Sequence, residues 1–196
     1  MEMLLIILVL LALMAIGVWL YNRLIRKRNA FRNAFAQIDV QLKRRHDLIP
    51  NLVESVKGYM SHERETLTEV IEARNSAEQV RQQASGTPGD PATMAELGRA
   101  EGTLGGVLSR LFALSESYPE LRASENFRQL QEELTSTENR VSYARQAYND
   151  AVMKYNNAVQ TVPSNAVASM FNFGVVAMLE FEDREQLQQA PRVSFS

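Results

Sequence analysis

An uncharged stretch near the start of the chain constrains the fold most strongly. It runs from Met3 to Leu20, and its eighteen residues are almost all apolar. A helix needs about 20 mostly apolar residues to cross the hydrocarbon core of a bilayer. Trp19 and Tyr21 stand where aromatic side chains gather at the boundary between lipid and water. The sequence therefore predicts a transmembrane signal-anchor helix over residues 1–22.

A cleaved signal peptide is the competing interpretation of this stretch. Signal peptides carry basic residues before a shorter apolar core and end at a cleavage site of the small-x-small type. Here the charged side chain before the stretch is Glu2, and no such cleavage site occurs before Tyr21. The sequence therefore favours a helix that is retained as an anchor.

Basic residues follow the apolar stretch and indicate how it is oriented. They are Arg23, Arg26, Lys27, Arg28 and Arg32. Positively charged flanks remain in the cytoplasm. We therefore expect a single-pass protein with its N-terminus outside and its C-terminal domain in the cytosol. The same flank predicts contact with anionic membrane lipid, at about 1 kcal/mol for each charge near the surface.

The next part of the chain carries the pattern of a long amphipathic helix. From Phe31 to Val80, apolar residues recur at alternating steps of four and three, as in a coiled coil. Pro50 interrupts this run, and proline removes the hydrogen bond to the carbonyl of His46. The pattern keeps its phase across Pro50, so we favour one continuous helix, kinked there and extending to Val80, over a helix that ends at Pro50.

Two further helices complete the expected bundle over residues 23–162. A loop with two prolines and two glycines spans Ala84 to Thr93, and a helix follows that Pro119 ends. A third long helix begins after Ser124, a good N-cap, and closes before Pro163. Long helices in a small domain pack antiparallel. The predicted fold class is all-α, an N-terminal transmembrane helix followed by an elongated antiparallel bundle of three to four helices.

The last region, residues 163–196, is an apolar segment followed by a tail. Seventeen residues from Pro163 to Leu179 carry no charge, but Gly174 interrupts them and they are too few for a second span. They either form a short helix packed back on the bundle or expose an apolar surface to a partner, a second copy or the bilayer. The candidate interface residues are Met170, Phe171, Phe173, Val175, Val176, Met178 and Leu179.

The densest polar cluster lies in the first long helix and contains Arg45, His46, Asp47 and Pro50. Arg45 falls on the apolar stripe, where an unpaired charge would be costly. We therefore expect it to pair with a carboxylate from a neighbouring helix. Such pairs set register more than they add stability, so the cluster is interpreted as structural. The candidate partners are Asp39, Glu54, Glu133 and Glu138.

No motif typical of catalysis or of a bound cofactor occurs in the sequence. Cysteine is absent, which excludes disulfides, thiolate metal sites and a cysteine nucleophile. His62 and Glu63 resemble the start of a zinc-protease motif, but Thr66 stands where the second histidine is needed. The net charge of −2 lacks the basic excess of nucleic-acid binders. We therefore expect no enzyme, no cofactor or metal, and neither nucleic acid nor a small-molecule substrate as a partner.

One block of sequence is distinctive enough to indicate a family. It runs from Gln37 to Glu54 and reads QIDVQLKRRHDLIPNLVE. Together with Tyr148-Asn149, Tyr155-Asn156 and Ala190-Pro191-Arg192-Val193, it resembles the LemA family signature, and the resemblance covers nearly the whole chain. One departure is Val162, where the family usually has Phe.

The resemblance implies a bacterial protein with an N-terminal helix in the inner (cytoplasmic) membrane and a cytosolic helical bundle. Family members have no established biochemical function. One is needed for magnetosome membrane formation, and family genes often lie beside a membrane metalloprotease of the HtpX type. The leading hypothesis is a non-enzymatic membrane-anchored scaffold or adaptor that self-associates into a homo-oligomer. The alternative is an accessory or regulatory subunit of an HtpX-like membrane protease in envelope quality control, with a membrane protein as partner.

Overall fold

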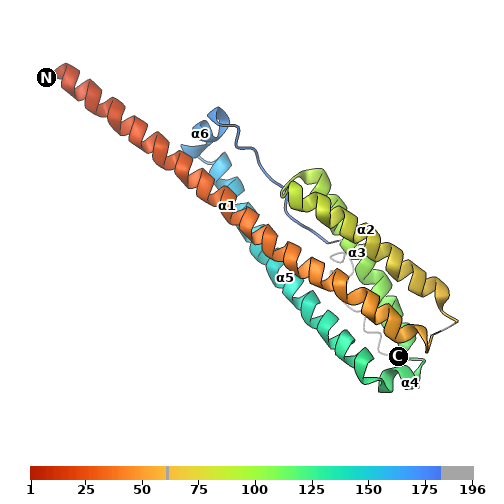
Figure 1. Ribbon diagram of the computed structural model, residues 1–196. Helices are drawn as coiled ribbons and strands as arrows, with labels where there is room; N and C mark the ends of the chain where they lie inside the picture. Colours follow the sequence, from red (N-terminus) through yellow and green to blue (C-terminus); the bar gives the residue numbers. More distant parts are fainter. Residues whose placement is uncertain (61, 182–196) are drawn as a thin grey trace, which may run out of the picture.

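The computed structural model describes residues 1–60 and 62–181, and this part of the chain contains six helices and no strand (Figure 1). The chain is therefore all-α, as predicted. The tail beyond residue 181, with the Ala190–Val193 match, lies outside the described residues. The helices are α1 (Glu2–Lys57), α2 (Arg64–Gly86), α3 (Pro91–Ser115), α4 (Pro119–Ala123), α5 (Glu125–Gln160) and α6 (Ser164–Met170).

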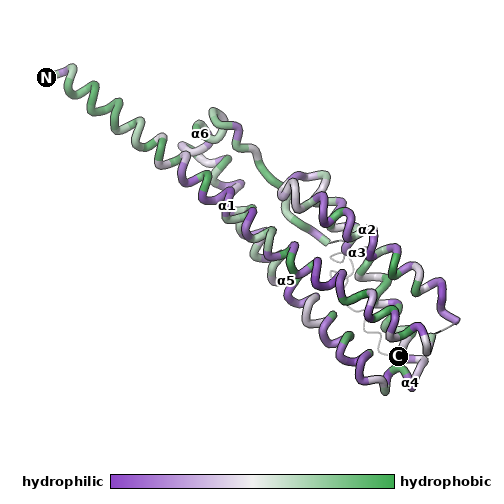
Figure 2. The backbone as a smooth tube through the Cα atoms, in the orientation of Figure 1, coloured by the Kyte–Doolittle hydropathy of each residue, from purple (hydrophilic) through white to green (hydrophobic). Residues whose placement is uncertain are grey.

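The first part of α1 projects beyond the rest of the molecule. Figure 2 shows that this projecting part is almost entirely hydrophobic. Among the described residues, α1 is the helix that is long and apolar enough to cross a membrane. It passes the expected boundary between residues 22 and 23 without interruption. The apolar end and the bundle therefore share one continuous helix.

The length expected for the first long helix of the bundle is wrong. The helix does continue through Pro50, but it ends at Lys57 instead of extending to Val80. The next helix, α2, begins at Arg64 and runs back beside α1 (Figure 1). The apolar pattern does not reveal this turn, because α2 directs its own stripe into the same core and happens to keep the phase.

The other helix boundaries lie close to the predicted ones. The loop between α2 and α3 is shorter than expected, and the Asp90 side chain caps α3 by accepting a hydrogen bond from the Thr93 amide at 2.9 Å. Pro119 begins the short helix α4, while α3 already ends at Ser115. Ser124 is the N-cap residue of α5, although its side chain forms no capping hydrogen bond.

The bundle consists of two packed pairs of helices. α1 packs along α5, α2 packs along α3 and also against α1, and α6 contacts both α1 and α5 (Figure 1). The buried apolar side chains form two clusters along this bundle. One includes Leu24 and Leu42 of α1 and lies toward α6, and the other includes Ile49 and Val56 and lies toward α4. The section of α1 between Leu42 and Ile49 carries the polar side chains described below.

Candidate functional site: a buried polar layer

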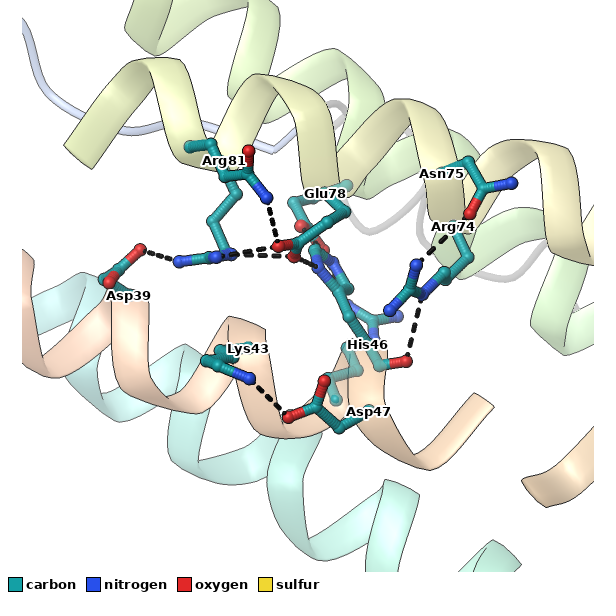
Figure 3. A network of polar contacts seen from close by, with 11 residues as sticks. Asp39, Lys43, His46, Asp47, Arg74, Asn75, Glu78 and Arg81 are labelled. Carbon is teal, nitrogen blue, oxygen red and sulfur yellow. Dashed lines mark hydrogen bonds and ion pairs between the residues drawn. The ribbon is translucent and has the colours of Figure 1, made fainter. Parts of the chain in front are cut away.

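A layer of charged side chains crosses the bundle between the two apolar clusters, and Figure 3 shows the part of it that joins α1 and α2. All four long helices contribute to it, at positions that lie between apolar core residues on the same helix. Four of its residues are buried: Arg45, His46, Arg81 and Glu101. We call this set the polar layer. It comprises Asp39, Arg45 and His46 of α1, Glu78 and Arg81 of α2, Glu101 of α3 and Glu138 of α5.

His46 lies at the centre of the polar layer, between two carboxylates. Its Nδ1 is 2.8 Å from Glu78 Oε2, and its Nε2 is 2.8 Å from Glu101 Oε1. A neutral imidazole carries only one N–H group. Which ring nitrogen donates depends on the tautomer, and each nitrogen lies within hydrogen-bond distance of one carboxylate oxygen. The histidine joins α1, α2 and α3 through one ring.

Arg45 extends the layer toward α5. Its Nη1 lies 2.9 Å from Glu138 Oε2 and 3.4 Å from Glu101 Oε2. The prediction that Arg45 pairs with a carboxylate of a neighbouring helix is confirmed, and Glu138 was among the expected partners. Glu101 was not. The other three expected partners bind elsewhere, Asp39 to Arg81, Glu54 to Lys57 and Glu133 to Arg44.

Arg81 closes the layer on the side of α2. Its Nε and Nη2 donate to the two oxygens of Glu78 at 2.9 and 2.8 Å, and its Nη1 donates to Asp39. The hydrogen bond from Arg81 is the main reason that the pKa of Glu78 is held far below its usual range, against the opposing effect of burial. The hydrogen bond with Glu78 likewise raises the pKa of Arg81, helped by Asp39. Glu78 and Arg81 are therefore both charged at neutral pH.

The other two residues of the predicted cluster lie outside the layer. Asp47 is exposed and pairs with Lys43 at 2.8 Å. Pro50 is also exposed and acts through the backbone, because it leaves the carbonyl oxygen of His46 without its helical donor. The Nε of Arg74, on α2, donates to that oxygen at 3.2 Å (Figure 3). The structure thus brings Arg45 and His46 together and places Asp47 on the surface.

The polar layer is an ionic network with a buried centre and partly exposed edges, where the Glu138 side chain is 47% exposed and the Asp39 side chain 27%. The His46 and Glu101 side chains have no exposed surface, and each charge meets an opposite charge from another helix or turn. The carboxylates of Glu78 and Glu101 lie on opposite nitrogens of the ring, so they do not converge on a common point. Within residues 1–60 and 62–181, no group of three or more metal-ligating side chains is placed to hold an ion. The layer is suited to fixing helix register.

The candidate interface residues of the C-terminal segment divide into two groups. Phe173 and Leu179 are buried in the core of the bundle, and Val176 is partly buried against it. They are therefore occupied within the subunit. Met170, Phe171, Val175 and Met178 remain exposed. The short helix α6 packs on the bundle, and residues 173–181, which we call the C-terminal strap, continue in extended form along α5.

Two Tyr-Asn pairs on α5 hold the strap by its backbone. The amide of Asn149 bonds both the N–H and the carbonyl of Leu179, at 2.9 and 3.0 Å, and Asn156 does the same for Val176, at 3.0 and 2.8 Å. The adjacent tyrosines, Tyr148 and Tyr155, donate to strap carbonyls at 2.9 and 3.0 Å.

The spacing of these pairs matches the strap. Seven residues of helix rise about 10.5 Å, and three residues of extended chain span about 10 Å. The sequence shows the repeat, but its role was missed because a Tyr-Asn pair on a helix has no fixed structural meaning by itself.

Comparison with known proteins places the chain in a family. The sequence model of the LemA family matches residues 34–195. The chain belongs to the LemA family. The match begins just after the basic flank and contains both the polar layer and the strap.

The individual relatives are distant in sequence. Protein LemA of Metamycoplasma hominis is 27% identical over 166 residues, which cover 85% of this chain and 71% of the relative. Magnetosome protein MamQ 2 of Paramagnetospirillum magneticum is 26% identical over 168 residues, covering 78% of this chain and 62% of the relative. Magnetosome protein MamQ of Magnetospirillum gryphiswaldense is 24% identical over the same shares. The aligned region thus spans less than two thirds of the magnetosome proteins.

Proposed function

We propose that this LemA-family protein is a non-enzymatic scaffold that α1 anchors in the membrane. The observation that carries the proposal is the continuity of α1 from its apolar end into both core clusters. A continuous helix has no linker at which the bundle could swing. From Leu20 to Lys57 the helix is about 55 Å long, so the bundle forms a rod held at a set angle to the bilayer.

The polar layer supports a structural role and not a catalytic one. The His46 and Glu101 side chains have no exposed surface, and the charged groups of the layer pair with one another across four helices. A catalytic group has to reach a substrate, whereas the His46 ring is enclosed between its two carboxylates. We infer that the layer keeps the rod rigid and in register.

Self-association is the second part of the proposal. Val175 and Met178 on the strap and Met153 on α5 remain exposed, and Met153 and Met178 line the same shallow hollow. Exposed apolar side chains that border one hollow, as Met153 and Met178 do, favour contact with a partner. A second copy held in the same membrane is at high local concentration, which makes it the partner we propose.

Cross-linking in native membranes followed by mass measurement tests this proposal. We expect products at multiples of the subunit mass, reduced in M153S/M178S and unchanged in a matched variant, V40S, whose exposed residue lies on α1 outside this hollow. Products containing only another membrane protein would contradict self-association and favour an accessory subunit instead. Release of the unmodified chain by carbonate would contradict the anchor.

The proposed orientation has its own test. Arg23, Arg26 and Lys27 follow the apolar end directly, which favours the cytosol for the bundle. A reporter that is active only in the cytosol, fused after Ser196, should be active. Activity of a reporter that works only outside the cytoplasmic membrane would reverse the orientation while leaving the anchor intact.

A further inference from the structure

The helix α6 lies at the level where α1 changes from apolar to basic. Leu20, the last residue of the uncharged stretch, is only 4% exposed, whereas Trp19 beside it is 55% exposed. The C-terminal segment packs on α1 at the next residue, where the Tyr21 ring lies 4.8 Å from that of Phe171 and 5.7 Å from that of Phe173. Figure 1 shows α6 beside α1 where the free part of α1 begins. A membrane crossed by α1 would therefore end at the height of α6.

Large apolar side chains project from both ends of α6. Val162 is 81% exposed, Met170 is 76% exposed and Phe171 is 53% exposed. Large apolar side chains exposed to this extent are unfavourable in water. At the boundary between headgroups and acyl chains, apolar and aromatic side chains are well accommodated.

Basic side chains line a hollow on the same end of the bundle. It lies between α1 and α5, and Arg23, Arg26 and Lys27 of α1 face Lys154 of α5 across it, with Asp150 as the acidic member of the lining. In the part of the chain that the structure describes, none of these four cations forms an ion pair. Lys27 lies seven residues beyond Leu20, about 10 Å along the helix, so its long side chain can reach back to a headgroup layer that is about 5–8 Å thick on each side of the bilayer.

We propose that this end of the bundle is a second membrane contact, in which Val162, Met170 and Phe171 enter the interface and the basic hollow binds the phosphate of an anionic phospholipid. The inference rests on the proposed anchor. Two observations specify a phospholipid of the adjoining leaflet as the occupant. The surface is continuous with the apolar end of α1, and its charge is opposite to that of the phosphate. Contact at α6 as well as at α1 holds the rod at a fixed tilt.

The position of α6 can be measured by tryptophan fluorescence, because Trp19 is the sole tryptophan of the chain. The full chain is reconstituted in vesicles of phosphatidylcholine and phosphatidylglycerol with bromine atoms near the headgroup end of the acyl chains. In W19F/F171W, the bromine should quench the fluorescence and the membrane should protect it from iodide. In the matched variant W19F/Y143W, which places the probe on an exposed site of α5, iodide should quench and bromine should not.

The same measurement separates this inference from the proposed anchor. In the unmodified chain, bromine quenching of Trp19 reports the anchor alone. If Trp19 is quenched while W19F/F171W behaves like W19F/Y143W, the second contact is wrong and the anchor stands. If Trp19 itself is open to iodide and not quenched by bromine, the anchor fails and the second contact with it.

The phosphate site is tested by the lipids that remain bound when the full chain is released in mild detergent. Mass measurement of the released chain should show more bound phosphatidylglycerol than phosphatidylcholine. K154Q should lower this preference about fivefold, the effect of one basic charge near an anionic surface. K57Q, which removes an exposed lysine at the far end of α1, should leave it unchanged. Equal lipid preference in K154Q and K57Q would overturn the site.

Discussion

The guanidinium of Arg74 donates a hydrogen bond from Nε to the backbone carbonyl of His46, across 3.2 Å. In a regular helix this carbonyl would accept from the amide of residue 50, but Pro50 has no N–H group. A side chain from α2 thus supplies the donor that α1 lacks. The proline becomes a point of attachment between the two helices, beside the polar layer, and the helix continues through it.

A double-mutant cycle between Arg74 and Pro50 tests this relationship. Arg74→Ala alone leaves the carbonyl of His46 without a donor and should lower the free energy of unfolding by about 1–2 kcal/mol. In a Pro50→Ala background the amide of residue 50 restores the helical bond, so the same substitution should cost clearly less. Urea unfolding of the four proteins in detergent measures both values. Equal costs in the two backgrounds would show that Arg74 does not replace the missing amide.

Arg45 and its neighbour Arg44 provide a matched comparison within the predicted cluster. Arg45→Ala takes the arginine away from the buried carboxylate of Glu101, which then keeps only its contact with His46, and should cost roughly 3 kcal/mol. Arg44→Ala removes a pair with Glu133 whose two side chains are about half exposed, and such pairs are worth about 1 kcal/mol or less. The thermal midpoint should fall strongly for the first variant and little for the second. Similar midpoints for the two would show that burial of the layer does not matter to stability.

The polar layer also predicts how stability depends on pH. The pKa of Glu78 is lower in the folded chain than the value of about 4.3 expected when it is unfolded. Below about pH 5 the unfolded chain therefore binds more protons than the folded one, and the free energy of unfolding falls as the pH falls. Glu78→Gln should flatten this decline. Glu132→Gln changes an exposed carboxyl with no ion pair in the described part of the chain, and it should leave the slope unchanged.

The helices themselves could be predicted because each one carries its own apolar stripe. The span, α3 and α5 follow from local spacing together with the prolines and caps at their ends. The turn after Lys57 could not be predicted in this way, since the stripe of α2 continues that of α1 in phase. Gly58 was the only local signal, and a single glycine within a helical pattern is often tolerated.

That missed turn explains why most of the polar layer was not predicted. The burial of Arg45 follows from its place on the stripe, and this required only α1. Pairing across helices depends on which residues of neighbouring helices lie at the same level along the bundle axis. The position of the turn determines these levels. If α2 continues α1 in one helix, Glu78 does not lie opposite His46. The position of Glu101 beside His46 then cannot be predicted either, because α3 follows α2.

The hydrogen bonds from the Tyr-Asn pairs of α5 predict which substitution should detach the strap from the bundle. Asn149→Ala removes both hydrogen bonds to the backbone of Leu179 and leaves these groups unsatisfied, at a cost of about 1–3 kcal/mol. The Leu179 amide should then exchange its hydrogen much faster, while the amides in the middle of α5 stay protected. Asn157→Ala changes an exposed asparagine on the same helix and should leave the strap unaffected. Equal exchange at Leu179 in both variants would rule out the role of Asn149.

Gly98 of α3 lies where the strap passes over the helix. A Cβ atom at this position would lie 2.0 Å from the carbonyl oxygen of Glu180, a backbone atom that cannot turn away as a flexible side chain could. The strap would therefore have to lift from α3. Phe181 would then lose its buried place, where its ring lies 4.3 Å from the guanidinium of Arg145.

Gly98→Ala should accordingly destabilise the protein although alanine is the better helix former. Helix propensity alone would favour alanine over glycine by about 1 kcal/mol. Gly106, on the same helix, has nothing within 4 Å of the place where a Cβ would lie. Gly106→Ala should therefore raise the free energy of unfolding, while Gly98→Ala lowers it and speeds hydrogen exchange in residues 176–181. If both substitutions stabilise the protein by the same amount, the strap does not pack on α3 as the structure shows, because the clash at Glu180 alone gives the two glycines opposite signs.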